Sequence, residues 1–458
     1  MINLFENFNA DSADLLRSEL YAKINIPSVA IHDNGFLPEE IDSPIKFYCG
    51  FRKEGHPLYF DKVPLPKYWR IEATGQNANV YDLNHKRAEI IYNSTDNTRE
   101  VTEVRWLDDN GAISWIEHYN NVGQLFAKTF YNQGKATLRK YFNQSGKEVI
   151  VQNLEVGDIF LNYRWCHKHF ANIAEFVVFY LKERKYNLDH IFYNTLNESL
   201  SVSLGVDTAG GDIMLWHEPT GNALPGNMDF LMKTKTRTKY IFFQNYREWQ
   251  KSKSLIPEDT GNVKFDFFGM VYPHPRSNQL RRKALIMTNS DQIEHLKEVV
   301  EAMPDIEFNI AAVTTMSDKL LAFKKYANVK VYPNVSRKKT VELFNECDVY
   351  FDINHQNEIL NSVRIAFEQN MLIVGFNNTL HQPKYISEKA VFAPDNVQGM
   401  KELVETSLND RIIMKDNIDY QRKMAGDISV DEFKKTFEKT FEKCTKWKRM
   451  KKVMSQVW

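Results

Sequence analysis

The stretch YFDINHQNEILNSVRIAFEQNMLIVGF, from Tyr350 to Phe376, decides the fold class of this chain. Its two apolar ends predict short buried strands, and its middle has the spacing of a helix. The same alternation of strand and helix recurs upstream from Phe265, with short connections between the runs. Because this pattern is typical of a doubly wound parallel sheet, we expect an α/β domain over this part of the chain.

A second set of such runs lies between Asp158 and Gln244. HIFYNT, DIMLWHE and KYIFFQN predict buried parallel strands, and ANIAEFVVFYLKERK predicts a helix. PSVAIHDNGFLP, near the start of the chain, fits the first strand of this same domain. The polar stretch from Lys251 to Asn262 predicts a linker between the two α/β domains.

A different pattern fills residues 106–150. Gly111, Gly123, Gly134 and Gly146 recur at spacings of 12, 11 and 12 among aromatic and β-branched residues. Because glycine supplies the positive φ of tight turns, this spacing predicts a β-meander inserted into the first α/β domain. We therefore expect four parts: a first Rossmann-like domain (1–45 and 154–250), an extended β-sheet domain (46–153), a second Rossmann-like domain (263–430), and a C-terminal helix with a basic tail (431–458).

The C-terminal part allows two interpretations. Phe433, Phe437 and Phe441 lie on one helical face, and the basic run KWKRMKK follows. This segment is either the solvated end of a packing helix or a site that binds anionic lipid. In the second case Trp447 and Met450 would contribute to the membrane contact.

The composition indicates a large globular protein. The chain has 458 residues, 43% hydrophobic and 13% aromatic, with zero formal net charge. The composition favours several folded domains over extended disorder. Because the net charge is zero, the chain as a whole does not attract polyanions, and we expect no nucleic-acid partner. No run reaches the roughly 18 apolar residues of a membrane span, and the start does not have the pattern of a signal peptide.

The cysteines give no sign of metal or disulfide chemistry. Cys49, Cys166, Cys347 and Cys444 are far apart and include no CxxC pair. We interpret them as thiols of a reducing cytoplasm, and we expect a cytoplasmic protein without a metal or cofactor.

Two doubly wound domains would bind a nucleotide sugar at the carboxyl ends of their strands. Glu368 sits where a ribose-binding carboxylate is expected, on the helix before a strand. A partner eight residues earlier would share its helical side, but that position is Leu360. Glu358 is ten residues earlier and, at about 100° per residue, points elsewhere. The carboxylate pair of a sugar-nucleotide site is therefore broken.

The expected phosphate loop, FFGMVYPHPRSN, is also poor. Gly269 is present, but Pro273 and Pro275 remove two N–H donors. The cations at residues 281–283 lie at a strand entrance rather than at its exit. We therefore predict no catalytic residues in this chain.

Polar residues at two strand exits are candidates for binding at the cleft between the domains. His355 follows one strand, and Trp216, His217, Glu218 and Asn227 come from LWHEPTGNALPGNM. A His–Glu pair can act as a general base, but neighbours on an extended strand point in opposite directions. We expect these residues and the carboxylate above to line the cleft and contact an acceptor without catalysing a reaction.

The segments NGFLPEEIDSP, HPLYFDKVPLPKYWRI, LDHIFYNTL, LWHEPTGNALPGNM and FEQNMLIVGF, together with the meander, closely resemble one family over essentially the whole chain. It is the family of glycosyltransferase-stabilising proteins, the B subunits of the accessory Sec system glycosyltransferase. The resemblance implies a GT-B frame of two Rossmann-like domains with an inserted extended β-sheet domain. It also implies a catalytic A subunit as partner, which carries the UDP-N-acetylglucosamine site.

The resemblance further implies that the two subunits attach N-acetylglucosamine to Ser and Thr of serine-rich repeat adhesins before export. The B subunit would stabilise its partner and hold the acceptor, without transferring sugar alone. Complexes of two A and two B subunits, and association with the inner face of the membrane, are further expectations of the family.

Two other functions stay open from the residues. The chain could be an autonomous retaining glycosyltransferase with Glu368 on the ribose, or an adhesin-binding chaperone with no role in transfer. For the meander, exposed aromatic residues such as Tyr119, Phe130 and Tyr141 would contact the partner, unless they pack within the sheet.

Overall fold

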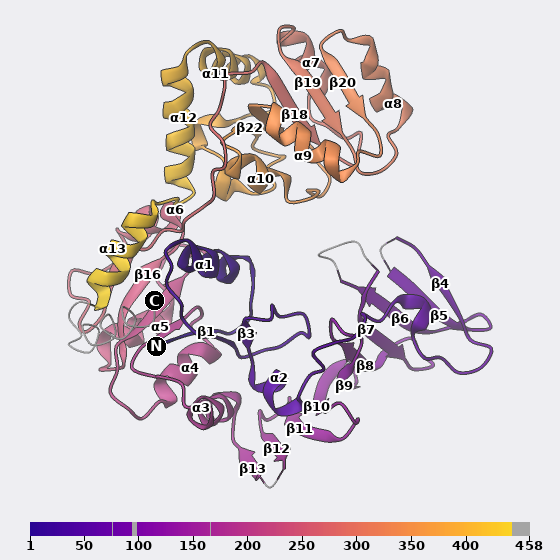
Figure 1. Ribbon diagram of the computed structural model, residues 1–458, viewed down its shortest axis with the longest axis vertical. Helices are drawn as coiled ribbons and strands as arrows, with labels where there is room; N and C mark the ends of the chain where they lie inside the picture. The colour runs from indigo at the N-terminus through magenta and orange to yellow at the C-terminus, as the bar shows by residue number, and fades with distance from the viewer. Residues whose placement is uncertain (76, 94–98, 165, 442–458) are drawn as a thin grey trace. The chain divides into compact units, whose positions relative to one another are not determined.

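The computed structural model describes residues 1–75, 77–93, 99–164 and 166–441 (Figure 1). The chain forms two compact units. The first contains residues 1–13, 24–242 and 256–265, and the second contains residues 14–23, 243–255 and the chain from 266 onward. Helix α1 (Ala10–Tyr21) contributes residues to both.

The first unit contains a Rossmann-like sheet with the strand order β17-β16-β15-β14-β1-β2-β3 in the described part of the chain. Its strands are β1 (Ile2–Phe5), β2 (Ser28–Ala30), β3 (Ile41–Asp42), β14 (Ile191–Tyr193), β15 (Asp212–Trp216), β16 (Thr238–Phe243) and β17 (Lys264–Phe267). Its helices are α2 (Pro44–Cys49), α3 (Ile173–Glu183), α4 (Glu198–Gly205) and α5 (Gly226–Lys233). The strand order reverses between β1 and β14, which is the switch point of a doubly wound sheet.

Two sequence expectations for this sheet were wrong. Its first strand is β1, not the strand at Ser28–Ala30, which pairs beside it as β2. The four buried residues of β1 are too few to show a periodicity in the sequence. Strand β17, expected to open the second α/β domain, lies instead at the edge of the first sheet.

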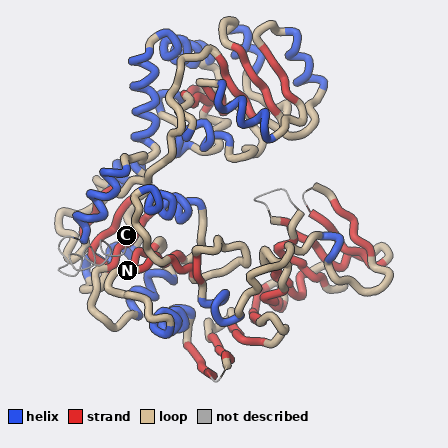
Figure 2. The backbone as a smooth tube through the Cα atoms, in the orientation of Figure 1, coloured by secondary structure: helices blue, strands red, loops and turns tan. Residues whose placement is uncertain are grey.

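The predicted meander is an antiparallel sheet whose strands neighbour one another in chain order from β4 to β13 (Figure 2). They are β4 (Arg70–Ala73), β5 (Asn77–Asp82), β6 (His85–Tyr92), β7 (Val101–Leu107), β8 (Ile113–Tyr119), β9 (Leu125–Asn132), β10 (Lys135–Phe142), β11 (Glu148–Asn153), β12 (Ile159–Tyr163) and β13 (Cys166–Phe170). The last two strands continue the sheet beyond residue 153, in a stretch that the sequence had assigned to the first α/β domain.

The turn glycines behave as predicted. Gly111, Gly123, Gly134 and Gly146 all have φ between +72° and +82°. At Gly123 the spacing also matters, because an added Cβ would lie 2.5 Å from the carbonyl oxygen of His56. Glycine is therefore required at this turn for both its φ and its small size.

The meander aromatics are less exposed than one hypothesis required. Tyr119 and Tyr141 are only 6% and 5% exposed, so the expectation of exposed partner contacts is wrong for both. Phe130 is half-buried and pairs across the sheet with Trp115 and Leu138. The alternative of packing within the sheet is confirmed for the two tyrosines.

The second unit contains a parallel sheet with the order β20-β19-β18-β21-β22-β23 in the described residues. Its strands are β18 (Lys283–Met287), β19 (Glu307–Ala311), β20 (Val329–Tyr332), β21 (Val349–Asp352), β22 (Leu372–Phe376) and β23 (Val391–Phe392). Its helices are α6 (Tyr246–Ser252), α7 (Leu296–Ala302), α8 (Asp318–Leu321), α9 (Arg337–Glu346), α10 (Ser362–Glu368), α11 (Val397–Asn409), α12 (Arg411–Met424) and α13 (Val430–Phe441). This order is that of a Rossmann-like sheet, with its switch point between β18 and β21.

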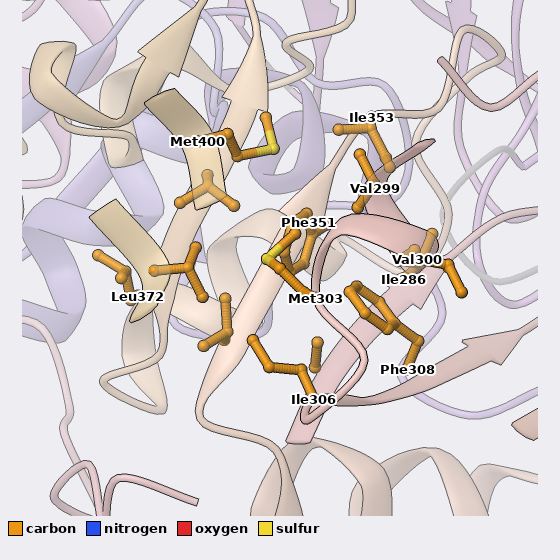
Figure 3. Close-up of a cluster of buried hydrophobic side chains, with 14 of the residues drawn as sticks. Ile286, Val299, Val300, Met303, Ile306, Phe308, Phe351, Ile353, Leu372 and Met400 are labelled. Carbon is orange, nitrogen blue, oxygen red and sulfur yellow. The ribbon is translucent and has the colours of Figure 1, made fainter. Parts of the chain in front are cut away.

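A continuous apolar core fixes this sheet to its helices (Figure 3). Ile286 and Phe351 from the strands pack with Val299 and Met400 from the helices and with Met303, which follows α7, and all are at most 1% exposed. Two parallel sheets with helices and an inserted antiparallel sheet confirm the predicted α/β fold class.

One predicted helix begins later than expected. The run DQIEHLKEVVEAM has the amphipathic spacing of a helix from residue 291, but α7 starts at Leu296, after His295 with φ of +47°. Ile293 instead forms a bridge with Asn354. Amphipathic spacing alone could not show this pairing with a distant residue.

At the C-terminus, Phe433 and Phe437 on α13 are buried, and Phe433 packs on Phe268 with ring centroids 4.8 Å apart. This favours a packing helix over a lipid foot for the described part of α13. The basic tail at residues 442–458, with Cys444, lies outside the described residues. Every helix in the described residues is too short or too polar to span a lipid bilayer.

Candidate functional site

The switch point of the second sheet is closed by the protein's own backbone. The segment after β18 returns across the carboxyl end of β21, where Glu294 N donates to Ile353 O at 2.8 Å and His355 N donates to Gln292 O at 3.0 Å. Open α/β sheets bind ligands in this crevice. Here the backbone N–H groups of Glu294 and His355 are used in hydrogen bonds within the chain.

Glu368, the predicted ribose carboxylate, is committed to an ion pair. Its Oε1 accepts a hydrogen bond from Arg364 Nε at 2.9 Å, within α10. The same guanidinium donates to Asp14 Oδ1 at 2.5 Å. Burial opposes the charges, but the hydrogen bond between them raises the pKa of Arg364 and lowers the pKa of Asp14. Glu368 is thus part of a structural ion cluster.

The residues ahead of α10 do not follow the helical spacing assumed from the sequence. The helix begins at Ser362, and Leu360 and Asn361 have φ of +55° and +58°. Leu360 is 52% exposed. Glu358 accepts from Val363 N at 2.8 Å, which satisfies a free donor of the first turn. Residues 358–361 therefore do not continue the helix of Glu368, contrary to the prediction, although residue 360 is a leucine and the second carboxylate is absent.

The expected phosphate cations have other partners. Arg281 binds Asp348 at 2.9 Å, beside Arg276, and Lys283 binds Glu346 at 3.3 Å, on the amino-terminal side of the sheet. Gly269 packs against Gly426, where an added Cβ would lie 2.4 Å from the carbonyl oxygen. The prediction that these cations lie at a strand entrance is confirmed, and this glycine serves chain packing.

Two histidines bind carboxylates at the carboxyl end of the second sheet. His355 Nε2 contacts Glu294 Oε2. His381 Nδ1 lies 2.5 Å from Asp352 Oδ1, and its Nε2 lies 2.6 Å from Gln356 O. The hydrogen bond to the carboxylate raises the pKa of His381 to about 9, so both nitrogens donate at neutral pH. This imidazolium, which the sequence analysis missed, ties together the loops after β21 and β22.

The switch point of the first sheet is filled by Glu6. Glu6 N donates to Asn194 Oδ1 at 2.9 Å, and its carboxylate accepts from Glu198 N at 3.0 Å and from the hydroxyl of Thr195. The negative charge therefore lies at the amino end of α4, the usual place for a bound anion. On either side of Glu6 the carboxyl edge of the sheet opens into a cavity.

The smaller cavity, about 380 Å³, brings three predicted site residues together. Trp216, Glu218 and Asn227 line it, and Asn227 Nδ2 donates to Leu196 O at 2.8 Å. Trp216 Nε1 is buried without a hydrogen-bond partner in the described residues. His217 Nδ1 is likewise buried and without a partner among them. Glu218 is exposed, so it reaches solvent at this edge.

The larger cavity, about 1120 Å³, lies between the loops after β1 and β2 and the face of strands β6 to β10. Glu103 and Arg105 on β7, His118 on β8 and Arg139 on β10 line it. None of these four residues was predicted from the sequence. Glu103 and Arg105 are two apart on a strand, so their shared face could have been noticed, but their approach to the N-terminal loops depends on long-range folding.

No group of three or more His, Cys, Asp or Glu side chains in the described residues is arranged to hold a metal ion. Cys49 and Cys347 are buried free thiols. Burial raises the pKa of both, so neither is a reactive thiolate.

Known protein families match four stretches of this chain. The GtfB N-terminal domain family matches residues 2–48, the GtfB middle domain 69–171, the GtfB third domain 173–255 and the GftB/GlyA-F C-terminal domain 284–421. A relative from Limosilactobacillus reuteri subsp. suis, the UDP-N-acetylglucosamine–peptide N-acetylglucosaminyltransferase stabilizing protein GtfB, is 49% identical over 95% of this chain and 98% of its own.

Two solved structures define the fold. A chain in the crystal structure of a GtfA/B complex bound to UDP and GlcNAc is 38% identical, with a TM-score of 0.90 over 96% of this chain and 99% of that chain. S. aureus TarM, at 12% identity and a TM-score of 0.52 over 96% of this chain and 99% of its own, shares the fold alone. The fold is therefore of GT-B type, as expected.

Proposed function

This chain belongs to the GtfB family of glycosyltransferase-stabilising proteins, and from that premise we propose that it is the non-catalytic, acceptor-binding subunit of a heteromeric protein O-GlcNAc transferase. Its partner is a catalytic subunit of the GtfA kind. Its acceptor is the Ser- and Thr-rich polypeptide of a serine-rich repeat adhesin, glycosylated before export by the accessory Sec system.

The observation that carries the non-catalytic role is the closed switch point of the second sheet. A nucleotide sugar needs free backbone N–H groups and a cation at the carboxyl edge, together with a carboxylate for its ribose. The hydrogen bonds from Glu294 and His355 occupy that edge. The one correctly placed carboxylate, Glu368, is bound by Arg364. A nucleotide sugar would therefore have to break several native contacts.

For the acceptor, the geometry favours Trp216, Glu218 and Asn227, which share the smaller cavity at the carboxyl edge of the first sheet. We propose that His217, beside them in sequence, contributes to the same edge. His355 and Glu368, the remaining candidates, already have partners, so an acceptor that used them would have to compete with Glu294 and Arg364.

Calorimetry and turnover assays with UDP-N-acetylglucosamine separate this proposal from an autonomous transferase. We expect the purified chain to bind the nucleotide sugar weakly or not at all and to transfer no sugar to a Ser-rich peptide. Addition of the catalytic partner should yield a co-eluting complex with higher activity than the partner alone. Tight binding and turnover by the lone chain would contradict the non-catalytic role.

The same mixing experiment tests the chaperone alternative. An adhesin-binding protein without a role in transfer would bind the peptide but neither co-elute with the catalytic partner nor raise its activity. Variant Asn227→Ala, compared with Asn328→Ala in the second unit, tests the acceptor edge. The first substitution should weaken peptide binding and the second should leave it unchanged.

We also propose that the protein works in the cytoplasm, at the inner face of the membrane, with the basic tail as the contact. Flotation with anionic vesicles, using the full chain and a chain ending at residue 441, tests this. Equal flotation of both would exclude the tail.

A further inference from the structure

The smaller cavity of the first unit, which we assign to the acceptor, lies at the beginning of α5. It has a volume of about 380 Å³. It is lined by Leu196 after β14, by Trp216 at the end of β15, and by Gly226 and Asn227, the first two residues of α5. The first N–H groups of an α-helix have no partner within the helix and point out of its amino end. The cavity therefore lies where α5 presents backbone donors.

The amino end of α5 keeps two backbone donors that the chain itself does not use. No side chain in the described residues caps the helix, which follows Pro225. The N–H groups of Gly226 and Asn227 have no acceptor in this part of the chain, and the first bond at this end runs from Met228 N to Pro225 O at 2.9 Å. The side chain of Asn227 is already used, because its Nδ2 donates to Leu196 O at 2.8 Å. The two backbone N–H groups are therefore available to a ligand.

Trp216 supplies a third donor from a different element. It lines the cavity and is 4% exposed, and its indole N–H has no hydrogen-bond partner among the described residues. An indole nitrogen can only donate, and a buried donor without an acceptor costs free energy. An oxygen atom of a ligand in the cavity would remove that cost. Strand β15 and helix α5 thus each contribute N–H groups that lack an acceptor.

The charge of the cavity excludes an anionic ligand. Among the described residues that line it, Glu218 alone is charged, and its side chain is exposed. This carboxylate would repel a phosphate or a carboxylate group, although the amino ends of helices otherwise favour anions. The other side chains of the wall are amides or apolar groups, among them Asn197, Pro219 and Pro225. The oxygen that accepts from the three N–H groups therefore belongs to an uncharged group.

A peptide carbonyl fits these donors better than a hydroxyl or a sugar does. A carbonyl oxygen only accepts, and it has two lone pairs, so it matches a group of N–H donors that cannot accept. A hydroxyl would also need an acceptor for its own proton, and the carboxylate of Glu218 is exposed to water, which competes for it. A sugar would need an open aromatic face for stacking, whereas the ring of Trp216 is covered. The volume lies near the lower end of the roughly 300–1,000 Å³ of small-molecule sites, which suits one or two residues of an extended chain.

We propose that this cavity holds the acceptor by its backbone carbonyl oxygens, through the N–H groups of Gly226, Asn227 and Trp216, and leaves the hydroxyl side chains of the acceptor free. The inference rests on the proposed function and deepens it, because it states which atoms of the acceptor are recognised. A site that reads the backbone binds Ser, Thr and Ala alike. It also leaves each hydroxyl available for glycosylation by the catalytic partner.

The test measures the binding of two fluorescent peptides to the complex of this chain with its catalytic partner. One peptide is rich in Ser and Thr, and in the other Ala replaces every Ser and Thr. Gly226→Pro removes one N–H, and proline is well tolerated at the first position of a helix. Gly226→Ala keeps this N–H, and its Cβ would meet no atom within 4 Å.

Two further variants complete the set. Trp216→Phe removes the indole N–H. Lys233→Ala is the control, because this lysine pairs with Asp229 at 2.7 Å on the same helix and does not line the cavity. Co-elution with the partner checks the fold of each variant, and Gly226→Pro keeps the test decisive if Trp216→Phe does not fold.

We expect Gly226→Pro and Trp216→Phe each to lower the affinity about threefold to tenfold, by the same factor for both peptides. Gly226→Ala should bind more tightly than Gly226→Pro, and Lys233→Ala should bind as wild type does.

Three results would overturn the inference alone. They are a loss confined to the peptide with hydroxyls, no binding of the alanine peptide to wild type, and equal affinities of Gly226→Ala and Gly226→Pro. Displacement of the alanine peptide by free N-acetylglucosamine from wild type but not from Gly226→Pro would assign the cavity to a sugar and contradict the proposal. If neither peptide bound to the wild-type complex, the acceptor role itself would be wrong.

Discussion

Arg364 and Glu368 form an ion pair at 2.9 Å within a single turn of α10. The carboxylate at the ribose position is thereby held by the chain's own cation, and that cation is itself bound to Asp14. What looks in the sequence like half of a sugar-nucleotide motif is, in the folded protein, an internal ion cluster beneath two tyrosine rings, Tyr272 and Tyr385.

Restoring the missing carboxylate should not restore catalysis. We expect Leu360→Glu to transfer no sugar in the absence of the partner, because residue 360 precedes α10 in a left-handed conformation and Glu368 stays bound to Arg364. Radiolabelled sugar transfer to a Ser-rich peptide is the measurement, with Leu360→Gln as the uncharged control. Turnover by the glutamate variant alone would show that the closed switch point is no barrier.

Removing the central cation should weaken the second unit. In Arg364→Leu the Asp14 carboxylate, 3% exposed, keeps Arg17 and Lys384 but loses its most buried partner. Loss of one member of a buried pair typically costs about 3 to 5 kcal/mol, and the two remaining partners place this case at the lower end. Urea denaturation measures the loss, and Asp14→Asn added to Arg364→Leu should recover part of it. If the double variant loses as much unfolding free energy as the two single variants together, or more, Asp14 and Arg364 are not coupled.

The histidine in the meander cavity should make stability depend on acid. The pKa of His118 falls from 6.5 to about 4 on folding, because burial and Arg139 disfavour its charge. The stabilising effect is complete above pH 6.5 and is lost as the pH falls from there toward 4, by at most about 3 kcal/mol. His118→Asn should therefore lose less stability than wild type between pH 7 and pH 5 in urea titrations. Parallel curves would show that His118 titrates normally.

The histidine of the second unit should act in the opposite direction. Its hydrogen bond to Asp352 raises the pKa of His381 from 6.5 to about 9. Its contribution is complete below pH 6.5 and is lost as the pH rises through 9, again by at most about 3 kcal/mol. Urea midpoints at pH 6.5 and 9.5 should differ more for wild type than for His381→Gln. An equal difference in both proteins would show that the stability lost at alkaline pH comes from groups other than His381.

Local signals in the sequence predicted much of the fold. The glycine spacing predicted the turns of the meander because each turn needs a left-handed residue at a fixed place. The runs around Phe308 and Phe351 predicted parallel strands because both faces of such strands are buried. The absence of a second carboxylate eight residues before Glu368 could be predicted from the sequence alone, because residue 360 is a leucine.

Pairings between distant residues could not be predicted in this way. The bridge from Ile293 to Asn354 shortens a helix that the spacing extends, and nothing near either residue indicates it. The contact of Thr129 with both Arg139 and His118 depends on the register of three neighbouring strands. The meander cavity was missed for this reason, since its walls come from segments on opposite sides of the insertion point.

The contact between Asp14 and Arg364 has a consequence for synthesis. The two residues are 350 positions apart, so at about 5–20 residues per second roughly 20 to 70 seconds pass between their appearance at the ribosome. During that time residues 14–23 lack the rest of the unit to which they belong. One of the earliest helices of the chain is therefore among the last to reach its native surroundings. A nascent chain released before Arg364 is synthesised would carry Asp14 without the guanidinium that binds its carboxylate.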